Sequence, residues 1–504
     1  MALIFYKNKK SHKKTEEKNI VFSVFGNGVV NEVDDLIAKP NECKTSYNLI
    51  FKDGALKTGL GFDYLKGPAS ETDLEENWHT YKFADYVSQI DGIWLNRWFN
   101  TNINKFVYQI LFYDDTNKIL YGIPLIDEYD GDVWQKTTLI SGHPTYECEY
   151  RIDNADGAAF FTDTGLVFLG ATTEKLYANV PAMISCAVHY DNFFGITNTN
   201  RNTLVYTTNL NLTQWADAEN QTIEFLDNRG AFIKLVGFND YVYLFREHGI
   251  TKLSIYTSKE NFSCTHLYTS TSKIFEKSIC VCGDKILFAT RDGIYSFNGN
   301  SVDRIDDKND KYLRNLDNSN CSAVCLKGKY YLATRLDFND EEKIGSESIE
   351  NNINNVLIEI DVDTFDLVLF RGVDIKSLLT VENDMMCKLC ACFNSGSNKN
   401  QIGELQLNGK NFDENTEKLW MSHNTDLDYR GKRKKVKELI INSLYDCVVV
   451  IESDEEKIEI EISGSDKEQK IATNICGKAF QITFKTNKQY CEISKPMIIF
   501  DVVQ

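Results

Sequence analysis

Hydrophobic positions along most of this chain follow a short-range pattern. From about residue 80 onward, apolar residues alternate with polar ones or form short continuous runs, and Asp-Gly, Asn-Asp or Thr-Gly turns separate these runs. Alternation with a period of two indicates β-strands, whereas a period of 3.6 indicates helices. Helical periodicity does not extend beyond three turns anywhere in the chain. The pattern therefore predicts an all-β protein.

The strand pattern repeats at a regular interval. Residues 236–253 and 281–297 align without a gap at an offset of 44 residues, which matches Asp240 with Asp284 and Gly249 with Gly293. A further shift of 44 reaches residues 326–337, where Ala-Thr-Arg occurs again. Units of 40–50 residues with several strands each are typical of β-propellers, whose neighbouring units bury each other's faces.

The repeat predicts a β-propeller of about seven blades over residues 41–424. Candidate units start near residues 85, 148, 185, 231, 275, 319 and 374. An early hairpin at 44–62, with a Lys52-Asp53-Gly54 turn, is a candidate to supply a strand that closes the ring, because closure removes exposed sheet edges. An acidic, turn-rich insertion at 337–355 predicts a long exposed loop.

The two ends of the chain differ from the repeat. Residues 1–40 start with a lysine-rich run that predicts a basic arm and a lead-in segment. Residues 425–504 contain five apolar or alternating segments separated by Ser- and Asp-rich turns. This ending predicts a small antiparallel β-sandwich.

Composition narrows the range of partners. The formal net charge of −18 makes general binding to nucleic acid or to an anionic membrane unfavourable. No window approaches 18 uninterrupted apolar residues, so no membrane span is expected. No signal peptide is recognisable, and we interpret the 14 cysteines as reduced thiols made in a cytoplasm.

The densest cysteine group is Cys387, Cys390 and Cys392. The C-x-x-C spacing occurs in zinc and redox sites. A zinc site needs further ligands, and no histidine lies within 30 residues of this group. On a strand, Cys390 and Cys392 point to one face, so we favour core packing, with no metal and no cofactor. Cys280 and Cys282 have the same spacing and receive the same interpretation.

One stretch of the acidic chain is strongly basic and is the candidate partner-docking site. It contains Arg430, Lys432, Arg433, Lys434, Lys435 and Lys437. The simpler interpretation is a solvated loop that leads into the first strand of the sandwich. The functional interpretation is docking on an acidic surface, such as another subunit of this same protein.

Motifs of catalysis are absent from the sequence. We find no H-E-x-x-H, G-x-S-x-G, Walker A or G-x-G-x-x-G pattern, and paired carboxylates lie in polar loops. The chain is therefore predicted not to be an enzyme. Two alternatives stay open: a glycan- or receptor-binding module that uses Trp94, Trp98 and Trp134, which otherwise pack between blades, and a carbohydrate-active enzyme with convergent carboxylates or a metal on the propeller axis.

Two segments resemble a known class of proteins. The segment SYNLIFKDGALKTGLGF (46–62) resembles the opening of phage tail proteins that begin a propeller, and GDKILFATRDGIYSFNGNSVDRI (283–305) resembles their inner blades. The lysine-led β-sandwich at the end is also similar to that class. The nearest members are hub, nozzle or DNA-stabilisation proteins of short-tailed phages and propeller-bearing minor structural proteins of Firmicute phages. The high cysteine count and the lysine-rich start depart from that pattern.

The resemblance implies a structural role without catalytic residues. It implies a homo-oligomeric ring, often six-fold, in the neck or tail of the virion, assembled in the host cytoplasm. Such a ring forms or seals the genome conduit, docks on portal, adaptor or other tail proteins, and lets DNA pass without specific binding. We therefore predict a head–tail connector, nozzle or hub component.

Overall fold

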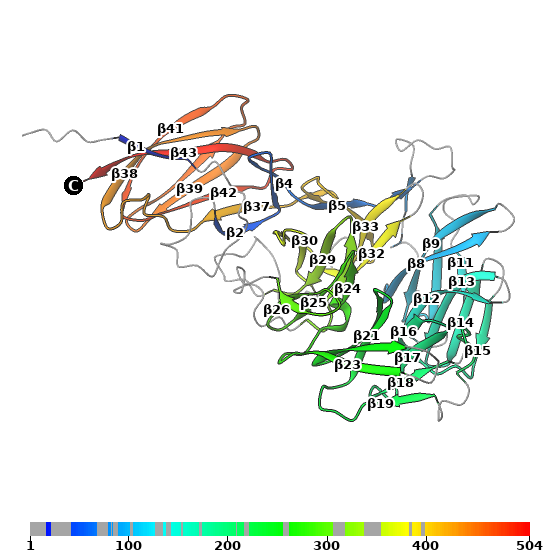
Figure 1. Cartoon of the computed structure of the whole chain (residues 1–504). Helices are drawn as coiled ribbons and strands as arrows, with labels where there is room; N and C mark the ends of the chain where they lie inside the picture. The colour runs from blue at the N-terminus through cyan, green and yellow to red at the C-terminus, as the bar shows by residue number, and fades with distance from the viewer. Residues whose placement is uncertain are drawn as a thin grey trace, which may run out of the picture. The chain divides into compact units, whose positions relative to one another are not determined.

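The computed structural model describes residues 17–21, 42–67, 79–81, 83, 89–100, 104–125, 135–137, 143–152, 155–170, 174–207, 209–215, 221–255, 262–305, 318–336, 354–382, 386–394 and 399–503 (Figure 1). These residues form sheets that are antiparallel except at the pairing of β5 (Gly61–Tyr64) with β35 (Lys410–Asn411), together with one 3-10 helix, η2 (Glu276–Ser278), so the all-β prediction is confirmed. Within these ranges, no helix has the length and apolar character needed to cross a membrane. The expected loop at 337–355 lies outside the described residues, apart from its last two positions.

The chain forms two compact units. One comprises residues 60–415, and the other combines residues 1–59 with residues 416–504. These boundaries differ from the expected ones at 40 and 424, because strands near the two chain ends pair with each other. Strand β2 (Cys43–Tyr47) pairs with β37 (Lys418–Ser422), and β4 (Ala55–Thr58) pairs with β43 (Glu492–Val503).

The described part of the 60–415 unit contains seven sheets of four or six strands and the two-stranded sheet β6 (Lys66–Gly67)–β7 (His79–Thr80). The first three sheets are as follows. Sheet one has β8 (Gly92–Asn100), β9 (Lys105–Asp114), β10 (Ile119–Pro124) and β11 (Gln135–Thr137). Sheet two has β12 (Pro144–Ile152), β13 (Ala155–Thr162), β14 (Gly165–Gly170) and β15 (Glu174–Tyr177). Sheet three has β16 (Met183–His189), β17 (Asn192–Thr197), β18 (Thr203–Tyr206) and β19 (Thr222–Glu224).

The next three sheets follow the same order along the chain. Sheet four has β20 (Phe232–Phe238), β21 (Tyr241–Arg246), β22 (Gly249–Ile255) and β23 (Phe262–Thr269). Sheet five has β24 (Cys280–Cys282), β25 (Lys285–Thr290), β26 (Gly293–Phe297) and β27 (Val302–Arg304). Sheet six has β28 (Ser322–Leu326), β29 (Lys329–Thr334), β30 (Val356–Asp361) and β31 (Leu367–Arg371).

The seventh sheet contains a strand from the start of the chain. Its order is β32 (Ile375–Glu382), β33 (Cys387–Phe393), β34 (Ile402–Gln406), β5 (Gly61–Tyr64), β35 (Lys410–Asn411) and β36 (Glu414–Asn415). Phe62 on β5 is fully buried, and its ring lies edge-on to Phe393 at 5.0 Å and to Phe370 at 5.5 Å. The early hairpin thus contributes only its last residues to this sheet, and its β3 (Leu49–Lys52) and β4 lie in the other unit.

Tight turns explain the 44-residue repeat. The hairpin that joins the first two strands of sheet four turns at Asn239 and Asp240, both with positive φ (48° and 61°). The equivalent turns of sheets five and six contain Gly283 (φ 63°) and Lys327-Gly328 (φ 51° and 73°). Two-residue hairpin loops favour positive φ because such turns match the twist of the flanking strands, and Asn, Asp and Gly tolerate it.

Each sheet packs on the next through buried apolar side chains. Apolar clusters connect sheets one and two, two and three, three and four, four and five, and six and seven. Strands β24 and β28 lie against each other and connect sheets five and six. A further cluster joins Cys390 and Val381 of sheet seven to Ile110 and Phe112 of sheet one. The seventh sheet therefore packs on the first.

The described part of the second unit contains two antiparallel sheets. One has the order β3-β4-β43-β38-β41, in which β38 spans Arg433–Ser443 and β41 spans Gln469–Gly477. The other has the order β2-β37-β42-β39-β40, with β42 (Phe480–Thr486), β39 (Cys447–Ser453) and β40 (Lys457–Ile462). Of the expected basic arm, residues 17–21 form β1, which pairs with β43 at Met497–Asp501, and the rest lies outside the described residues.

Candidate functional site

The basic stretch predicted from the sequence lies at the start of β38 and in the turn before it. Lys434 is fully buried, and its ammonium donates hydrogen bonds to three backbone carbonyls, those of Asp426 (2.8 Å), Tyr429 (3.1 Å) and Lys478. Burial lowers the pKa of Lys434, and the three carbonyls replace its lost hydration. Lys434 therefore stabilises this corner of the unit and is not available to a partner.

Two other members of the stretch have partners within the same unit. The Arg433 guanidinium donates hydrogen bonds to the carboxylate of Glu455, from Nε at 3.0 Å and from Nη2 at 2.6 Å. The Lys437 ammonium lies 3.0 Å from the carboxylate of Asp501 on β43. The docking hypothesis must therefore rest on the remaining three residues.

Arg430 and Lys432 are exposed, and Lys435 is half-buried. Within the described ranges, none of these three side chains forms an ion pair. The Lys432 ammonium lies 6.0 Å from the centre of the Tyr429 ring, which leaves it open to solvent. We refer to Arg430, Lys432 and Lys435 as the basic turn. Its charges are available to an acidic partner.

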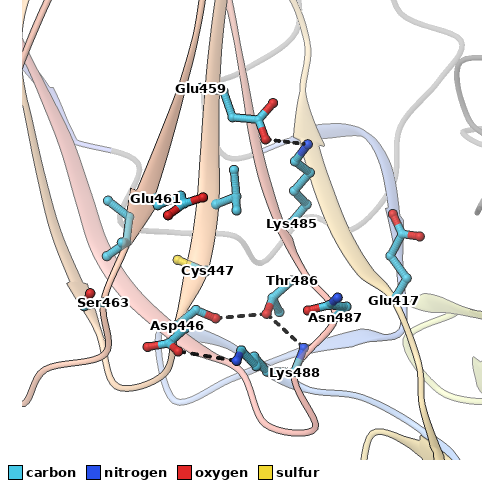
Figure 2. A pocket seen from close by; sticks show the side chains of 12 residues that line it. Glu417, Asp446, Cys447, Glu459, Glu461, Ser463, Lys485, Thr486, Asn487 and Lys488 are labelled. Carbon is cyan, nitrogen blue, oxygen red and sulfur yellow. Dashed lines mark hydrogen bonds and ion pairs between the residues drawn. The ribbon is translucent and has the colours of Figure 1, made fainter.

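An acidic pocket of about 570 Å³ lies on the other sheet of the same unit, along β40, β39 and the turn that follows β42 (Figure 2). Four carboxylates line it, those of Glu417, Asp446, Glu459 and Glu461, against the two ammonium groups of Lys485 and Lys488. Four negative and two positive charges leave a net charge of −2 on the lining. We refer to this site as the acidic pocket.

The ion pairs inside the acidic pocket are open to water. The Lys485 ammonium lies 3.2 Å from Oε1 of Glu459, and the Lys488 ammonium lies 3.6 Å from Oδ2 of Asp446. The backbone N–H of Gly464 donates to Asp446 and holds the pKa of that carboxyl below its usual range, so Asp446 stays ionised. Glu461, two residues after Glu459 on the edge strand β40, is exposed. Such a pocket suits a cationic side chain, because the surplus carboxylates can pair with it.

The cysteine group on β33 is part of the apolar interior. Cys390 and Cys392 are fully buried in the cluster that joins sheets seven and one, and burial raises the pKa of Cys392 to about 12. Cys387 is half-buried at the start of the strand. No group of three or more His, Cys, Asp or Glu side chains is arranged to hold a metal ion in the part of the chain that the structure describes.

The three tryptophans suggested for glycan binding do not form a described site. Trp94 lies edge-on to Phe160 at 5.2 Å and packs against the cluster between sheets one and two. Trp98 is described only as part of the backbone of β8, and Trp134 lies outside the described residues. The described position of Trp94 matches the packing interpretation.

An aromatic hollow between two hairpin turns was not predicted from the sequence. A depression of about 520 Å³ lies between the first hairpins of sheets three and four. Tyr190 is 68% exposed, and its ring lies 4.7 Å from that of His189, whose buried Nε2 has no hydrogen-bond partner among the residues that the structure describes. Tyr241 and Asp240 complete the hollow. In the sequence, the only indication of this site is that the two hairpin turns occupy matching positions of the repeat.

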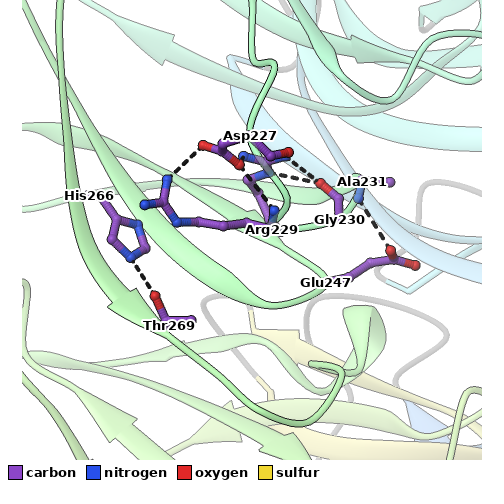
Figure 3. Close-up of polar contacts among 8 residues, drawn as sticks. Asp227, Arg229, Gly230, Ala231, Glu247, His266 and Thr269 are labelled. Atoms are coloured by element: carbon purple, nitrogen blue, oxygen red, sulfur yellow. Dashed lines mark hydrogen bonds and ion pairs between the residues drawn. The ribbon is translucent and has the colours of Figure 1, made fainter.

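The connection between sheets three and four is held by a buried arginine. The Arg246 side chain donates from Nε and Nη2 to the carbonyl of Gly230, at 2.9 Å and 2.6 Å, and pairs with Asp227. Arg229 also pairs with Asp227, and Glu247 accepts from the backbone of Ala231, so the turn at 227–231 is fixed from both sides (Figure 3). We regard this network as structural.

Comparisons with known proteins give no family. No protein-family model matches the chain, and no curated protein sequence matches it. Among solved structures, one match is the extracellular domain of a hybrid two-component system from B. thetaiotaomicron, with 13% identity and a TM-score of 0.38. That match covers 77% of this chain and 47% of the other, so the chain spans about half of that protein's length.

Proposed function

We propose that this chain is a non-enzymatic structural protein of a tailed phage or prophage virion, where copies assemble into a ring in the neck or tail. The main observation behind the proposal is that one unit has two surfaces of opposite charge, the basic turn and the acidic pocket. The resemblance of residues 46–62 and 283–305 to phage tail proteins supplies the setting.

Within this proposal, residues 60–415 form a closed seven-bladed β-propeller. Four observations support it. The seven sheets follow each other along the chain, each packs on the next, and the seventh packs on the first. Strand β5 comes before every other strand of the seven sheets in the sequence, yet it pairs with β34 in the last sheet. A propeller closed by strands from both ends of its chain resists opening, because unfolding must break that junction.

Residues 42–59 and 416–503 then form a β-sandwich that mediates assembly. The basic turn of one copy binds the acidic pocket of the next. Because the two surfaces are different, this contact is head-to-tail, and head-to-tail contacts generate rings when the rotation closes. The resemblance favours six copies. The net charge of −18 disfavours binding to passing DNA, because the protein and the DNA phosphates are both negatively charged.

A charge swap tests the assembly contact. Arg430→Glu/Lys432→Glu and, separately, Glu459→Lys/Glu461→Lys should each abolish oligomers in sedimentation velocity. An equimolar mixture of the two variants should recover mixed oligomers, because each keeps one intact surface and the two reversed surfaces also match. Lys467→Glu/Lys470→Glu changes the charge equally on exposed positions of the same unit and should leave assembly intact.

Three outcomes contradict parts of the proposal. A wild-type chain that stays monomeric at high concentration and moderate salt would remove the assembly contact. Particles of a phage that encodes the chain, purified and found by mass spectrometry to lack it, would remove the virion role. Loss of assembly in both charge variants without recovery on mixing would show that another surface drives association.

The aromatic hollow favours a second candidate function, a glycan-binding tail module. Tyr190 offers an exposed ring, and Tyr241 lines the same hollow with the Lys252 ammonium 3.4 Å from the centre of its ring. His189 and Asp240 offer polar groups beside them, the combination that concave ligand sites use. Glycan-array binding that disappears in Tyr190→Ala but persists in the exposed control Tyr445→Ala would support this function. The absence of any array signal from the wild type would remove it.

A further inference from the structure

Three thiols meet between the first strands of sheets five and six. Cys280 and Cys282 lie on β24, and Cys325 lies on β28, which packs against β24. The Cys282 thiol is within hydrogen-bonding reach of the thiols of both Cys280 and Cys325, and it also points to the carbonyl of Cys280 at 3.8 Å. Cys282 is buried, whereas Cys280 and Cys325 are half-buried and accessible to a small reagent. We refer to these residues as the thiol cluster.

The surroundings favour a thiolate in this cluster. The Lys234 ammonium on β20 donates to the carbonyl of Ile279 at 2.7 Å, which places a positive charge next to Cys280. The hydrogen bond from Cys282 lowers the pKa of Cys280 and of Cys325, and Lys234 lowers that of Cys280 further. The same interactions raise the pKa of Cys282, whose single S–H can donate to only one of these partners at a time. The other polar groups near the cluster, among the described residues, include Glu276, Lys277, Cys321, Tyr330 and Tyr331.

A second thiol pair provides an internal comparison. Cys148 on β12 and Cys186 on β16 also lie on neighbouring first strands, between sheets two and three. Burial raises the pKa of Cys148 to about 12 and that of Cys186 well above its usual range. This pair is alike in placement, and among the described residues no lysine affects the pKa of either thiol, so proximity and reactivity can be separated.

We propose that the thiol cluster is a thiol–disulfide exchange site, at which a small disulfide such as oxidised glutathione converts Cys282 and Cys325 into a disulfide that joins sheets five and six. The proposal does not depend on the virion role.

The exchange balances as two substitutions at sulfur. The Cys325 thiolate attacks one sulfur of the small disulfide, forms a mixed disulfide and releases one small thiolate. Cys282 passes its proton to the Cys280 thiolate along their hydrogen bond and then attacks the Cys325 sulfur, which releases the second small thiolate. Two protein thiols are oxidised, and one small disulfide is reduced to two thiols.

Strand geometry selects the pair. Cys280 and Cys282 are two residues apart on one strand, so their Cα atoms are separated by about 6.6 Å, at the upper end of the range that disulfides span. Cys282 and Cys325 lie on facing strands of adjacent sheets, where the thiols already meet. The cross-link therefore forms between the sheets, with Cys280 as the proton acceptor.

The test treats the full-length protein with oxidised glutathione at pH 7.5, blocks free thiols under denaturing conditions and maps tryptic peptides by mass spectrometry. We expect a cross-link between peptides 278–285 and 315–327 that persists in Cys321→Ala and is lost in Cys282→Ser and in Cys325→Ser. Cys280→Ala should keep the cross-link but form it more slowly. The Cys148–Cys186 pair should react at least about tenfold more slowly, since each unit of pKa changes the thiolate fraction about tenfold.

The wild-type protein alone can show whether the proposed disulfide between Cys282 and Cys325 forms. A Cys282 and Cys325 that stay free after prolonged treatment would overturn the proposal, and so would a cross-link that uses Cys321 instead. Equal rates at Cys148–Cys186 would show that proximity alone controls oxidation and would overturn the role of the cluster. Lys234→Met should slow the formation of the mixed disulfide, whereas Lys252→Met on β22 of the same sheet should not.

Discussion

Arg246→Ala is expected to weaken the connection between sheets three and four more than any exposed change nearby. Arg246 is 1% exposed, although it carries a permanent charge. Its guanidinium donates twice to the Gly230 carbonyl and pairs with Asp227. The rings of Phe225 and Phe232 lie 5.8 and 5.3 Å from it. Alanine removes all of these contacts and leaves the carbonyl without its donors.

The magnitude follows from the contacts. A hydrogen bond from a charged donor to a buried group is worth about 1.5–3 kcal/mol. Asp227 is 37% exposed, so its ion pair adds only about 0–1 kcal/mol. We therefore expect Arg246→Ala to reduce the free energy of unfolding by about 3–5 kcal/mol. Arg229→Ala breaks an exposed pair with the same carboxylate and should cost about 0–1 kcal/mol.

Urea unfolding, followed by tryptophan fluorescence, measures the two losses side by side. Hydrogen exchange localises them, and faster exchange in Arg246→Ala should concentrate in residues 222–255. Arg246→Lys should recover only part of the loss, because an ammonium lacks the planar fork that reaches both Gly230 and Asp227. If Arg246→Ala and Arg229→Ala prove equally mild, burial does not strengthen this network and the reasoning fails.

Three further changes test other parts of the structure. Burial, helped by the charge of Glu149, raises the pKa of Glu147 to about 8, so its stabilising protonated form is complete below about pH 4.5 and lost as the pH rises through 8. Glu147→Gln should therefore match the wild type in melting temperature near pH 4.5 and exceed it increasingly from pH 6 to 9, and a constant difference would contradict this. Lys434→Ala should cost about 3 kcal/mol or more in chemical denaturation, since it leaves three carbonyls without a donor, whereas Lys432→Ala should cost under about 0.5 kcal/mol. Phe62→Ala should cost about 3–5 kcal/mol, because the buried ring joins β5 to its sheet; a negligible shift in the thermal unfolding of that variant would show that β5 does not hold this sheet closed.

Local features of the fold could be predicted from the sequence. The 44-residue spacing corresponds to three hairpin turns, at Asn239-Asp240, at Gly283 and at Lys327-Gly328. Positive φ is a property of a few residues, so residue type alone indicates such turns. Continuous apolar runs such as those of β21 and β25 indicate strands that are buried on both faces, and the seven expected units begin close to the seven sheets.

The candidate site was predictable only in part. Six basic residues between 430 and 437 stand together in the sequence, yet the fold buries Lys434 and pairs Arg433 and Lys437 with carboxylates. Within the described ranges, only the basic turn is left without an ion pair. The alternating glutamates of KIEIEI were visible, but their position beside Asp446 and Glu417 was not. Which charge is used internally depends on carbonyls and carboxylates contributed by other strands.

Long-range pairing decided the rest. Thr58 and Cys491 exchange hydrogen bonds across 433 positions, which joins the two chain ends in one unit and moves the domain boundaries from those expected. Cys325 meets Cys282 because two neighbouring sheets pack face to face, although the sequence pattern of either strand is satisfied by simple burial. Period, turns and strand faces arise from interactions between near neighbours, so the sequence by itself determined them. The partners of each strand and of each buried charge arise from packing between distant segments, and only the tertiary structure decided them.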